Sequence, residues 1–172
     1  MIIQKKLRLI ELKKNNIVSN YKGLCKSIMG GLLVQESDSK ITNRNEWATV
    51  TKKKPSDLQL RDLNFSWQIC KHVKSNAIVI AKDQTTIGIG AGQMNRVGAA
   101  TIALKSAKEN CKEAVLASDG FFPFADTVAL AHEFGIKAII QPGGSIRDEE
   151  SIELCNEKEI SMVFTNRRHF LH

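Results

Sequence analysis

The last sixty residues alternate between strand patterns and helix patterns, and this rhythm constrains the fold more than any other feature. The strand patterns cover residues 114–117, 136–140 and 160–164, and the helical ones cover 124–134 and 148–157. Gly135 follows the first of these helices, where a glycine typically ends a helix. Strands that are joined through helices by short connections run parallel, with right-handed crossovers. We therefore predict an α/β domain with a parallel C-terminal β-α-β-α-β portion.

The earlier part of the chain predicts further elements on both sides of a polar loop at 36–55, which includes a short strand near 47–51. Ser56 and Gln59 form a capping box, so a helix is expected from there to about residue 74. The remaining predictions are strands at 5–12, 77–81 and 86–90, a tight connection at 82–84, a helix at 94–109, and a turn at Gly30-Gly31 that leads into a buried strand. Together these elements predict a mixed sheet.

Three loops follow the C-terminal strands, at 118–124, 141–147 and 165–170. In open parallel sheets, ligands bind off the carboxyl ends of the strands, so we expect the three loops to converge. The Gly143-Gly144-Ser145 amides suit an anion, Arg167-Arg168 suits an anion clamp, and the phenylalanines of the first loop suit a flat heterocycle. Taken singly, each is better explained by a capped turn, a solvated tail or core packing. Together they favour a site for an aromatic, anionic ligand.

Other motifs exclude several classes of protein. Gly88, Gly90 and Gly92 fit neither the dinucleotide fingerprint nor a P-loop, which leaves open a close backbone approach to a ligand or a neighbouring chain. No two histidines have metal-ligand spacing, so no metal is predicted. Lys71 and His72 are neighbours on a helix and are expected at the surface. The four cysteines lack a C-x-x-C pair, which fits a reducing cytosol.

The formal net charge of +7 is unevenly distributed. Residues 1–76 hold 15 Lys+Arg and 6 Asp+Glu, whereas residues 77–172 hold 10 and 12. A nucleic-acid-binding module in the first part is the less favoured interpretation, because no aromatic residues or known motif accompany the charge. No apolar run is long enough for a membrane and no export signal is visible, so we predict a cytoplasmic protein.

Several long segments resemble the family of bifunctional purine biosynthesis proteins. They include Ser-Asn-Ala-Ile-Val at 75–79, Ser-Asp-Gly-Phe-Phe-Pro-Phe at 118–124 and Gln-Pro-Gly-Gly-Ser-Ile-Arg-Asp at 141–148. The others are 30–35, 81–82, 86–97 and 168–172. Their order resembles the C-terminal part of the AICAR transformylase (phosphoribosylaminoimidazolecarboxamide formyltransferase) domain over nearly the whole chain. The resemblance makes 1–172 a portion of that domain, with strands and a loop at 1–55 and a ligand-site part at 56–172, and without the cyclohydrolase domain.

The resemblance implies a cytidine-deaminase-like fold without zinc, and formyl transfer from 10-formyltetrahydrofolate to AICAR at a dimer interface. Asn76 would hydrogen-bond the nucleotide's carboxamide near the reacting amine, Phe121 would pack on its imidazole, and Arg168 would contact its phosphate. The residues implied for the folate are Arg96, Val97, Pro123, Phe124, Asp126, Ser145 and Ile146.

The chain departs from the family in three places. Ala125 replaces the usual Arg beside Asp126, and Gly120 replaces the usual Ala, which we expect to be a small change. The upstream Lys-His-x-Ser-Pro-Ala-Gly motif, whose His is the family's proposed general base, is absent. We therefore expect either part of a split enzyme that a complementing N-terminal fragment completes, or a decayed remnant that binds ligand weakly.

Overall fold

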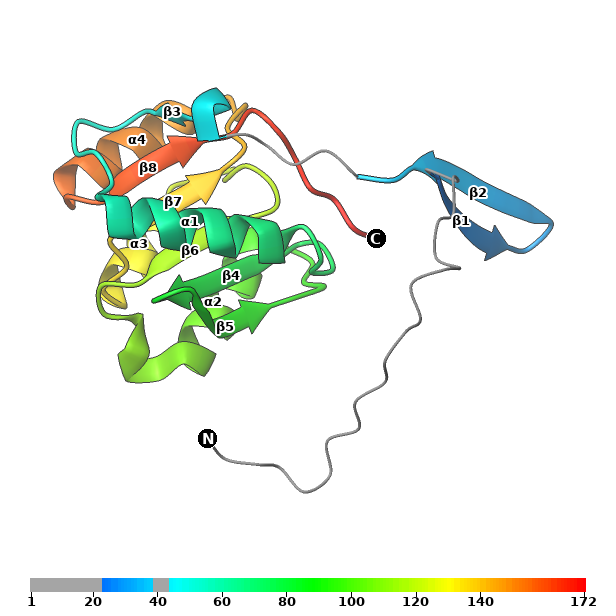
Figure 1. Ribbon diagram of the computed structural model, residues 1–172, viewed down its shortest axis with the longest axis horizontal. Coiled ribbons are helices and arrows are strands. Elements are labelled where there is room, and N and C mark those ends of the chain that lie inside the picture. Colours follow the sequence, from blue (N-terminus) through cyan, green and yellow to red (C-terminus); the bar gives the residue numbers. More distant parts are fainter. Residues whose placement is uncertain (1–22, 39–43) are drawn as a thin grey trace, which may run out of the picture. The chain divides into compact units, whose positions relative to one another are not determined.

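The computed structural model describes residues 23–38 and 44–172, and the chain divides into two compact units, Met1–Lys40 and Ile41–His172 (Figure 1). The strand predicted at 5–12 lies outside the described residues. Within the described ranges, no helix has the length and apolar character needed to traverse a bilayer.

The described part of the first unit is a hairpin. Strand β1 (Gly23–Ile28) pairs antiparallel with β2 (Gly31–Glu36), and Gly30 turns the chain at a φ of +82°, a conformation that favours glycine. The predicted turn and strand are therefore confirmed. The predicted burial is wrong: all six residues of β2 are exposed, because the hairpin has no covering layer among the described residues of its own unit.

The second unit is built on a six-stranded sheet with the order β3-β8-β7-β6-β4-β5. The strands are β3 (Ala48–Thr49), β4 (Ile78–Lys82), β5 (Thr85–Gly90), β6 (Val115–Ser118), β7 (Ala138–Gln141) and β8 (Ser161–Phe164). Strands β6, β7 and β8 are parallel. Strand β4 runs antiparallel to both β6 and β5, and β3 runs antiparallel to β8. The predicted α/β domain with a mixed sheet is confirmed.

Four α-helices and two 3-10 helices complete the described elements. They are α1 (Asp57–Cys70), α2 (Arg96–Ala107), α3 (Asp126–Glu133), α4 (Asp148–Glu157), η2 (Arg44–Glu46) and η3 (Lys108–Cys111). The Ser56 hydroxyl accepts from the Gln59 amide at 3.2 Å, and the Gln59 side chain accepts from the Ser56 amide at 2.9 Å, so the predicted capping box is confirmed. Helix α1 ends before residue 74 because the amides of His72 and Val73 turn to carbonyls only three residues back.

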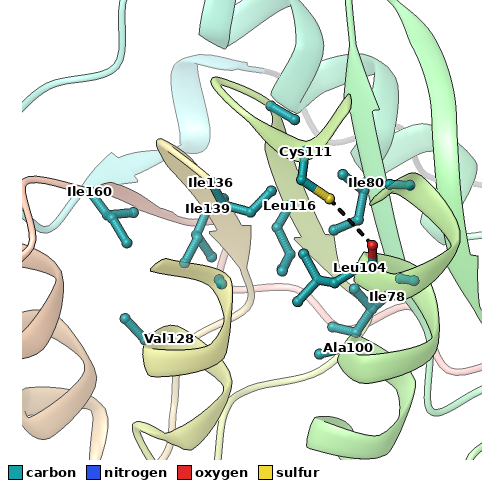
Figure 2. Close-up of a cluster of buried hydrophobic side chains, with 14 of the residues drawn as sticks. Ile78, Ile80, Ala100, Leu104, Cys111, Leu116, Val128, Ile136, Ile139 and Ile160 are labelled. Atoms are coloured by element: carbon teal, nitrogen blue, oxygen red, sulfur yellow. Dashed lines mark hydrogen bonds between the residues drawn. The ribbon is translucent and has the colours of Figure 1, made fainter. Parts of the chain in front are cut away.

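The helices cover the two faces of the sheet unequally. Helix α1 lies on one face, and α2, α3 and α4 lie on the other (Figure 1). Successive strand residues alternate between the two cores: Ile78 and Ile80 pack toward α2, whereas Val79 packs toward α1. Figure 2 shows the larger core, where side chains of β4, β6 and β7 pack against those of α2 and α3.

Two glycines of β5 bring helix α2 unusually close to the sheet. A Cβ added to Gly90 would stand 2.6 Å from the Ala99 carbonyl carbon and 2.9 Å from its Cα, and one on Gly88 would stand 3.0 Å from the Ala103 carbonyl carbon. The close approach left open by the glycine pattern is therefore to the backbone of α2. This contact fixes the helix that carries Arg96 at its first turn.

Candidate functional site

Two adjoining cavities lie at the carboxyl ends of the parallel strands. The first, of about 310 Å³, is lined by Asn76, Met94, Asn95, Arg96, Phe121, Pro123 and Phe170. The second, of about 570 Å³, is lined by Phe121, Pro123, Phe124, Gly144, Ser145, Ile146, Arg147 and Arg168. Phe121 and Pro123 belong to both linings. All three C-terminal loops reach the second cavity, which confirms their predicted convergence at one edge of the sheet.

Asn76 reaches this edge because β4 is antiparallel to β6, so that Ile78 pairs with Ser118 and the start of β4 lies beside the end of β6. The Asn76 side-chain amide donates to the Gln93 carbonyl at 2.8 Å. This bond orients the side chain at the mouth of the first cavity. It leaves the Asn76 Oδ1 atom available as an acceptor toward a ligand.

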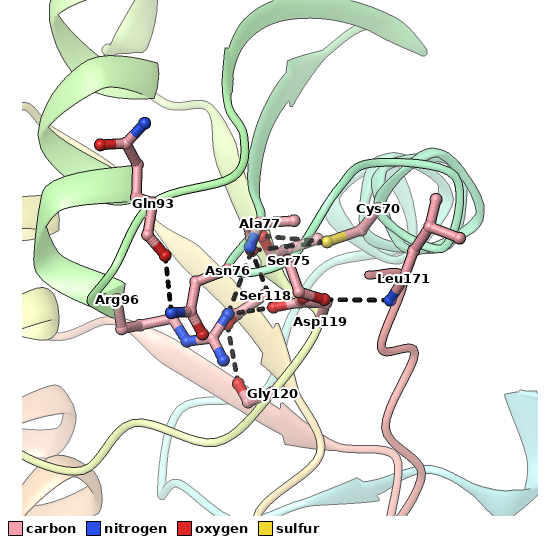
Figure 3. Close-up of polar contacts among 11 residues, drawn as sticks. Cys70, Ser75, Asn76, Ala77, Gln93, Arg96, Ser118, Asp119, Gly120 and Leu171 are labelled. Atoms are coloured by element: carbon pink, nitrogen blue, oxygen red, sulfur yellow. Dashed lines mark hydrogen bonds and ion pairs between the residues drawn. The ribbon is translucent and has the colours of Figure 1, made fainter. Parts of the chain in front are cut away.

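Asp119, which follows β6 directly, is the most connected side chain of the site (Figure 3). Its carboxylate is fully buried and forms an ion pair with Arg96, whose side chain is only 7% exposed. It also accepts from the Ala77 amide at 3.1 Å and from the Ser75 hydroxyl at 2.5 Å. Asp119 therefore ties the start of β4 to the start of α2.

This buried charge affects the neighbouring thiol of Cys70, which lies 3.7 Å from the Ala77 carbonyl oxygen and 3.8 Å from that of Ala117. Burial, and next the negative charge of Asp119, raise the pKa of the Cys70 thiol well above its ordinary value of 9.0. The thiol therefore stays protonated at neutral pH. A buried, protonated thiol is a packing group rather than a nucleophile.

Arg168 and Phe121 meet across the second cavity. The Arg168 guanidinium lies 5.0 Å from the centroid of the Phe121 ring and 5.8 Å from that of Phe170. Its side chain remains exposed. A cation stacked on aromatic rings keeps its N–H groups free at the edges, where they can still bind an anion bidentately.

The Gly143–Ser145 loop does not offer its amides to a ligand in the way that its sequence predicts. The amides of Gly144 and Ser145 both donate to the Asp148 carboxylate, at 2.6 and 3.1 Å, and the Gly143 amide donates to Gln141 Oε1 at 3.1 Å. The expectation of an open anion site here is wrong, because a carboxylate of the chain itself occupies it. The loop instead presents the Ser145 and Ile146 side chains to the second cavity.

Two of the predicted folate residues do not line either cavity. Val97 is half-buried on the first turn of α2, next to Arg96. Asp126 is exposed at the start of α3, where its Oδ1 accepts from the Thr127 amide at 2.7 Å. Ala125 precedes it as the N-cap residue and makes no side-chain cap bond.

Gly120 lies close to the ends of two side chains. A Cβ at this position would stand less than 3.0 Å from both Arg96 Nη2 and Phe170 Cε1. An Ala here requires the end of the Arg96 or the Phe170 side chain to shift, and none of the three nearest atoms belongs to the backbone, so the small change stays a prediction. Glycine allows the Arg96 guanidinium to lie back on Asp119.

Sequence reasoning did not single out Ser75, Asp119 or Asp148. Asp119 lies within the segment 118–124 that carries the family resemblance, and this was the signal that could have pointed to it. Its burial and its pairing with Arg96 cannot be inferred from one sequence. Over residues 23–38 and 44–172, no three His, Cys, Asp or Glu side chains gather in a way that would hold a metal ion.

These features define an α/β domain with a two-part ligand cavity at the carboxyl edge of its sheet. A model of the AICARFT/IMPCHase bienzyme family matches residues 1–106. The "Bifunctional purine biosynthesis protein PurH" of Prochlorococcus marinus strain MIT 9215 is 65% identical over 170 residues, and that of P. marinus subsp. pastoris is 66% identical over 170 residues. The alignments cover 99% of this chain and 33% of each relative.

The chain therefore belongs to the AICARFT/IMPCHase bienzyme family and spans about a third of the length of the curated relatives it matches. Among solved structures, Acinetobacter baumannii RibD matches 63% of this chain and 34% of its own, at 16% identity and a TM-score of 0.43.

Proposed function

We propose that this chain is the C-terminal portion of an AICAR transformylase domain, in which AICAR and 10-formyltetrahydrofolate occupy the two adjoining cavities. In that assignment the fold is the cytidine-deaminase-like one of the resemblance. The observation that carries the proposal is that eight of the ten residues implied by the resemblance line the two cavities. The shared wall of Phe121 and Pro123 would hold the two ligands beside each other, which a group transfer between them requires.

The chemistry of the linings supports both ligands, and the residues assigned to each ligand come from both cavities. Asn76 would accept from or donate to the carboxamide of AICAR, Phe121 would pack on the imidazole, and Arg168 would pair with the phosphate. The pterin and its linker would contact Phe124, Ser145 and Ile146 together with Pro123. Arg96 and Val97 would border the folate.

Asp126 would have to receive the pterin N–H groups from the start of α3, outside the cavity linings. A carboxylate is suited to a bidentate contact of this kind. In the family's pattern an Arg precedes this Asp, whereas Ala125 stands here, so the carboxylate lacks that positive neighbour. We expect a weaker hold on the folate than on the nucleotide.

The absence of the Lys-His motif leaves this chain with binding groups but without the proposed general base. The full reaction would need those residues from outside residues 1–172, for example from a complementing N-terminal fragment. A homodimer of residues 1–172 would not supply them, because each copy lacks the motif. A non-catalytic remnant that only binds ligand is the second candidate, and Ala125 in place of the family's usual Arg is the observation that favours it.

Binding of AICAR to the chain, measured by titration calorimetry, tests the site. Arg168→Ala should weaken binding by roughly 1.5–3 kcal/mol, the worth of a charged hydrogen bond, or about tenfold and more in the dissociation constant. Arg61→Ala removes an exposed arginine of α1 and should change nothing. Equal affinities of the two variants would reject the phosphate role, and absence of AICAR binding would reject the site.

Formyl transfer should then be assayed with the chain alone and after mixing with the N-terminal portion of a relative. Activity that appears only on mixing supports a split enzyme, and no activity in either case supports the remnant. Turnover by the chain alone would show that the missing motif is not needed as the base. A separate, salt-sensitive shift with RNA would favour the nucleic-acid alternative instead.

A further inference from the structure

The last eight residues, 165–172, contribute side chains to both cavities although they form no helix or strand. Arg168 lines the second cavity and Phe170 lines the first. Between them, His169 is buried, with its ring 4.6 Å from the Trp67 ring of α1. The direction of this segment, which we call the tail, must be set by its bonds to the rest of the unit.

The amides of Thr165 and Asn166 donate to the carbonyls of Gln141 and Pro142, and further along the tail bonds reach Ser75 and Asp119. The Leu171 amide donates to Ser75 Oγ at 3.0 Å, and the Ser75 amide donates to the Leu171 carbonyl at 2.8 Å. The His169 amide donates to the Asp119 carbonyl at 3.0 Å. Ser75 Oγ in turn donates to Asp119 Oδ2 at 2.5 Å. One hydroxyl thus joins the tail to the buried carboxylate (Figure 3).

The same carboxylate holds the other side of the first cavity. Asp119 Oδ1 accepts from the Ala77 amide, one residue after Asn76, and pairs with Arg96. Within the described part of the chain, Ser75 supplies the donor to Oδ2. Because a buried carboxylate oxygen without its donor is costly, the Ser75 hydroxyl is held in one orientation. That orientation lets it also accept from Leu171.

We infer that Ser75, backed by Asp119, is a positioning residue that fixes the tail against the entry to β4. It thereby holds Phe170 in the first cavity, which Asn76 also lines, and Arg168 in the second. Ser75 itself lines neither cavity. The inference rests on the proposed function only for the identity of the ligand, and its geometry can be tested without one.

The test compares Ser75→Ala, which removes the hydroxyl, with Ser75→Thr, which keeps it. The first readout is the NMR signal of the Arg168 side chain, which the rings of Phe121 and Phe170 shift by their ring currents. In Ser75→Ala the Arg168 signals should move toward those of an unstructured arginine, and Ser75→Thr should restore them.

The second readout is amide hydrogen exchange. Exchange at Leu171 and His169 should rise by about tenfold or more in Ser75→Ala, the factor that loss of one or two hydrogen bonds implies. The amides of Ile139 and Ile140 in β7 should stay protected, which shows that the unit remains folded. Arg168 signals that do not move while those β7 amides stay protected would overturn the inference, and so would a failure of Ser75→Thr to restore them.

The third readout is the dissociation constant for AICAR. If the unmodified chain binds AICAR, Ser75→Ala should weaken it about tenfold and Ser75→Thr should bind normally, whereas unchanged affinity in Ser75→Ala would overturn the positioning role. If the unmodified chain does not bind AICAR, the proposed function fails. The NMR and exchange results then decide the positioning role by themselves.

Discussion

Replacing Gly90 by Ala should separate helix α2 from the sheet. The added Cβ would stand 2.6 Å from the Ala99 carbonyl carbon and 2.9 Å from its Cα, about 1 Å closer than ordinary van der Waals contact. All the nearest atoms are backbone, so no side-chain rotation can relieve the overlap. Overpacking typically costs about 1–3 kcal/mol, and a rigid neighbour places this variant at the upper end, at about 3 kcal/mol.

The measurement is urea unfolding of the second unit, followed by its tryptophan signal. Gly92→Ala is the matched control, since a Cβ there meets nothing closer than 3.7 Å and only the φ of +64° opposes it, at a cost of about 1–2 kcal/mol. Ala99→Gly should not rescue Gly90→Ala, because the overlap is with backbone. Equal losses in Gly90→Ala and Gly92→Ala, or rescue by Ala99→Gly, would refute the reasoning.

Two further predictions concern stability. Ser56→Ala should cost about 1 kcal/mol in urea unfolding by breaking the capping box of α1, and Ser56→Thr should retain most of it; a loss below 0.3 kcal/mol, on the order of the measurement error, would contradict the cap. Burial raises the pKa of the Cys155 thiol from its ordinary 9.0 to about 12. Between pH 9 and 12 the thiol ionises in the unfolded chain but not in the folded one. Its contribution to the free energy of unfolding is therefore complete below pH 9 and is lost as pH rises from 9 to 12. At pH 10 the loss relative to pH 8 should be roughly 1.4 kcal/mol, and Cys155→Ala should lack that share of the pH dependence; parallel pH curves would contradict it.

The sequence predicted helix boundaries best where capping residues or a change of pattern mark the first and last residues of the helix. Helix α4 matches its predicted range, and Ser56 begins α1 with the predicted box. The predicted C-terminus of α1 was too late. The apolar spacing continues to Val73, but after Cys70 the amides of His72 and Val73 already bond to carbonyls three residues back. The exposure of β2 was missed because an apolar sequence reports what a strand can bury, and not what is present to cover it.

The convergence of three loops was predictable, since parallel strands end at the same edge. The arrival of Asn76 was not derivable from periodicity, because it depends on β4 running antiparallel to β6. The family resemblance supplied Asn76 as a residue, and the strand direction explains its place. The ligand roles of these residues stay predictions.

The pairing of Arg96 with Asp119 and the filling of the glycine loop by Asp148 were not predictable at all. Each depends on a carboxylate finding donors far along the chain or across a turn, and several candidate partners exist in the sequence for every charge. Only the folded geometry selects among them.

The internal bonds of Asp148 make the two ends of the second cavity different. A ligand phosphate placed near Gly144 and Ser145 would face a fixed negative charge and would have to evict it, whereas at Arg168 it meets a cation with unused N–H groups. The loop amides are therefore closed to an anion, and the cations left in the lining of this cavity are the side chains of Arg147 and Arg168.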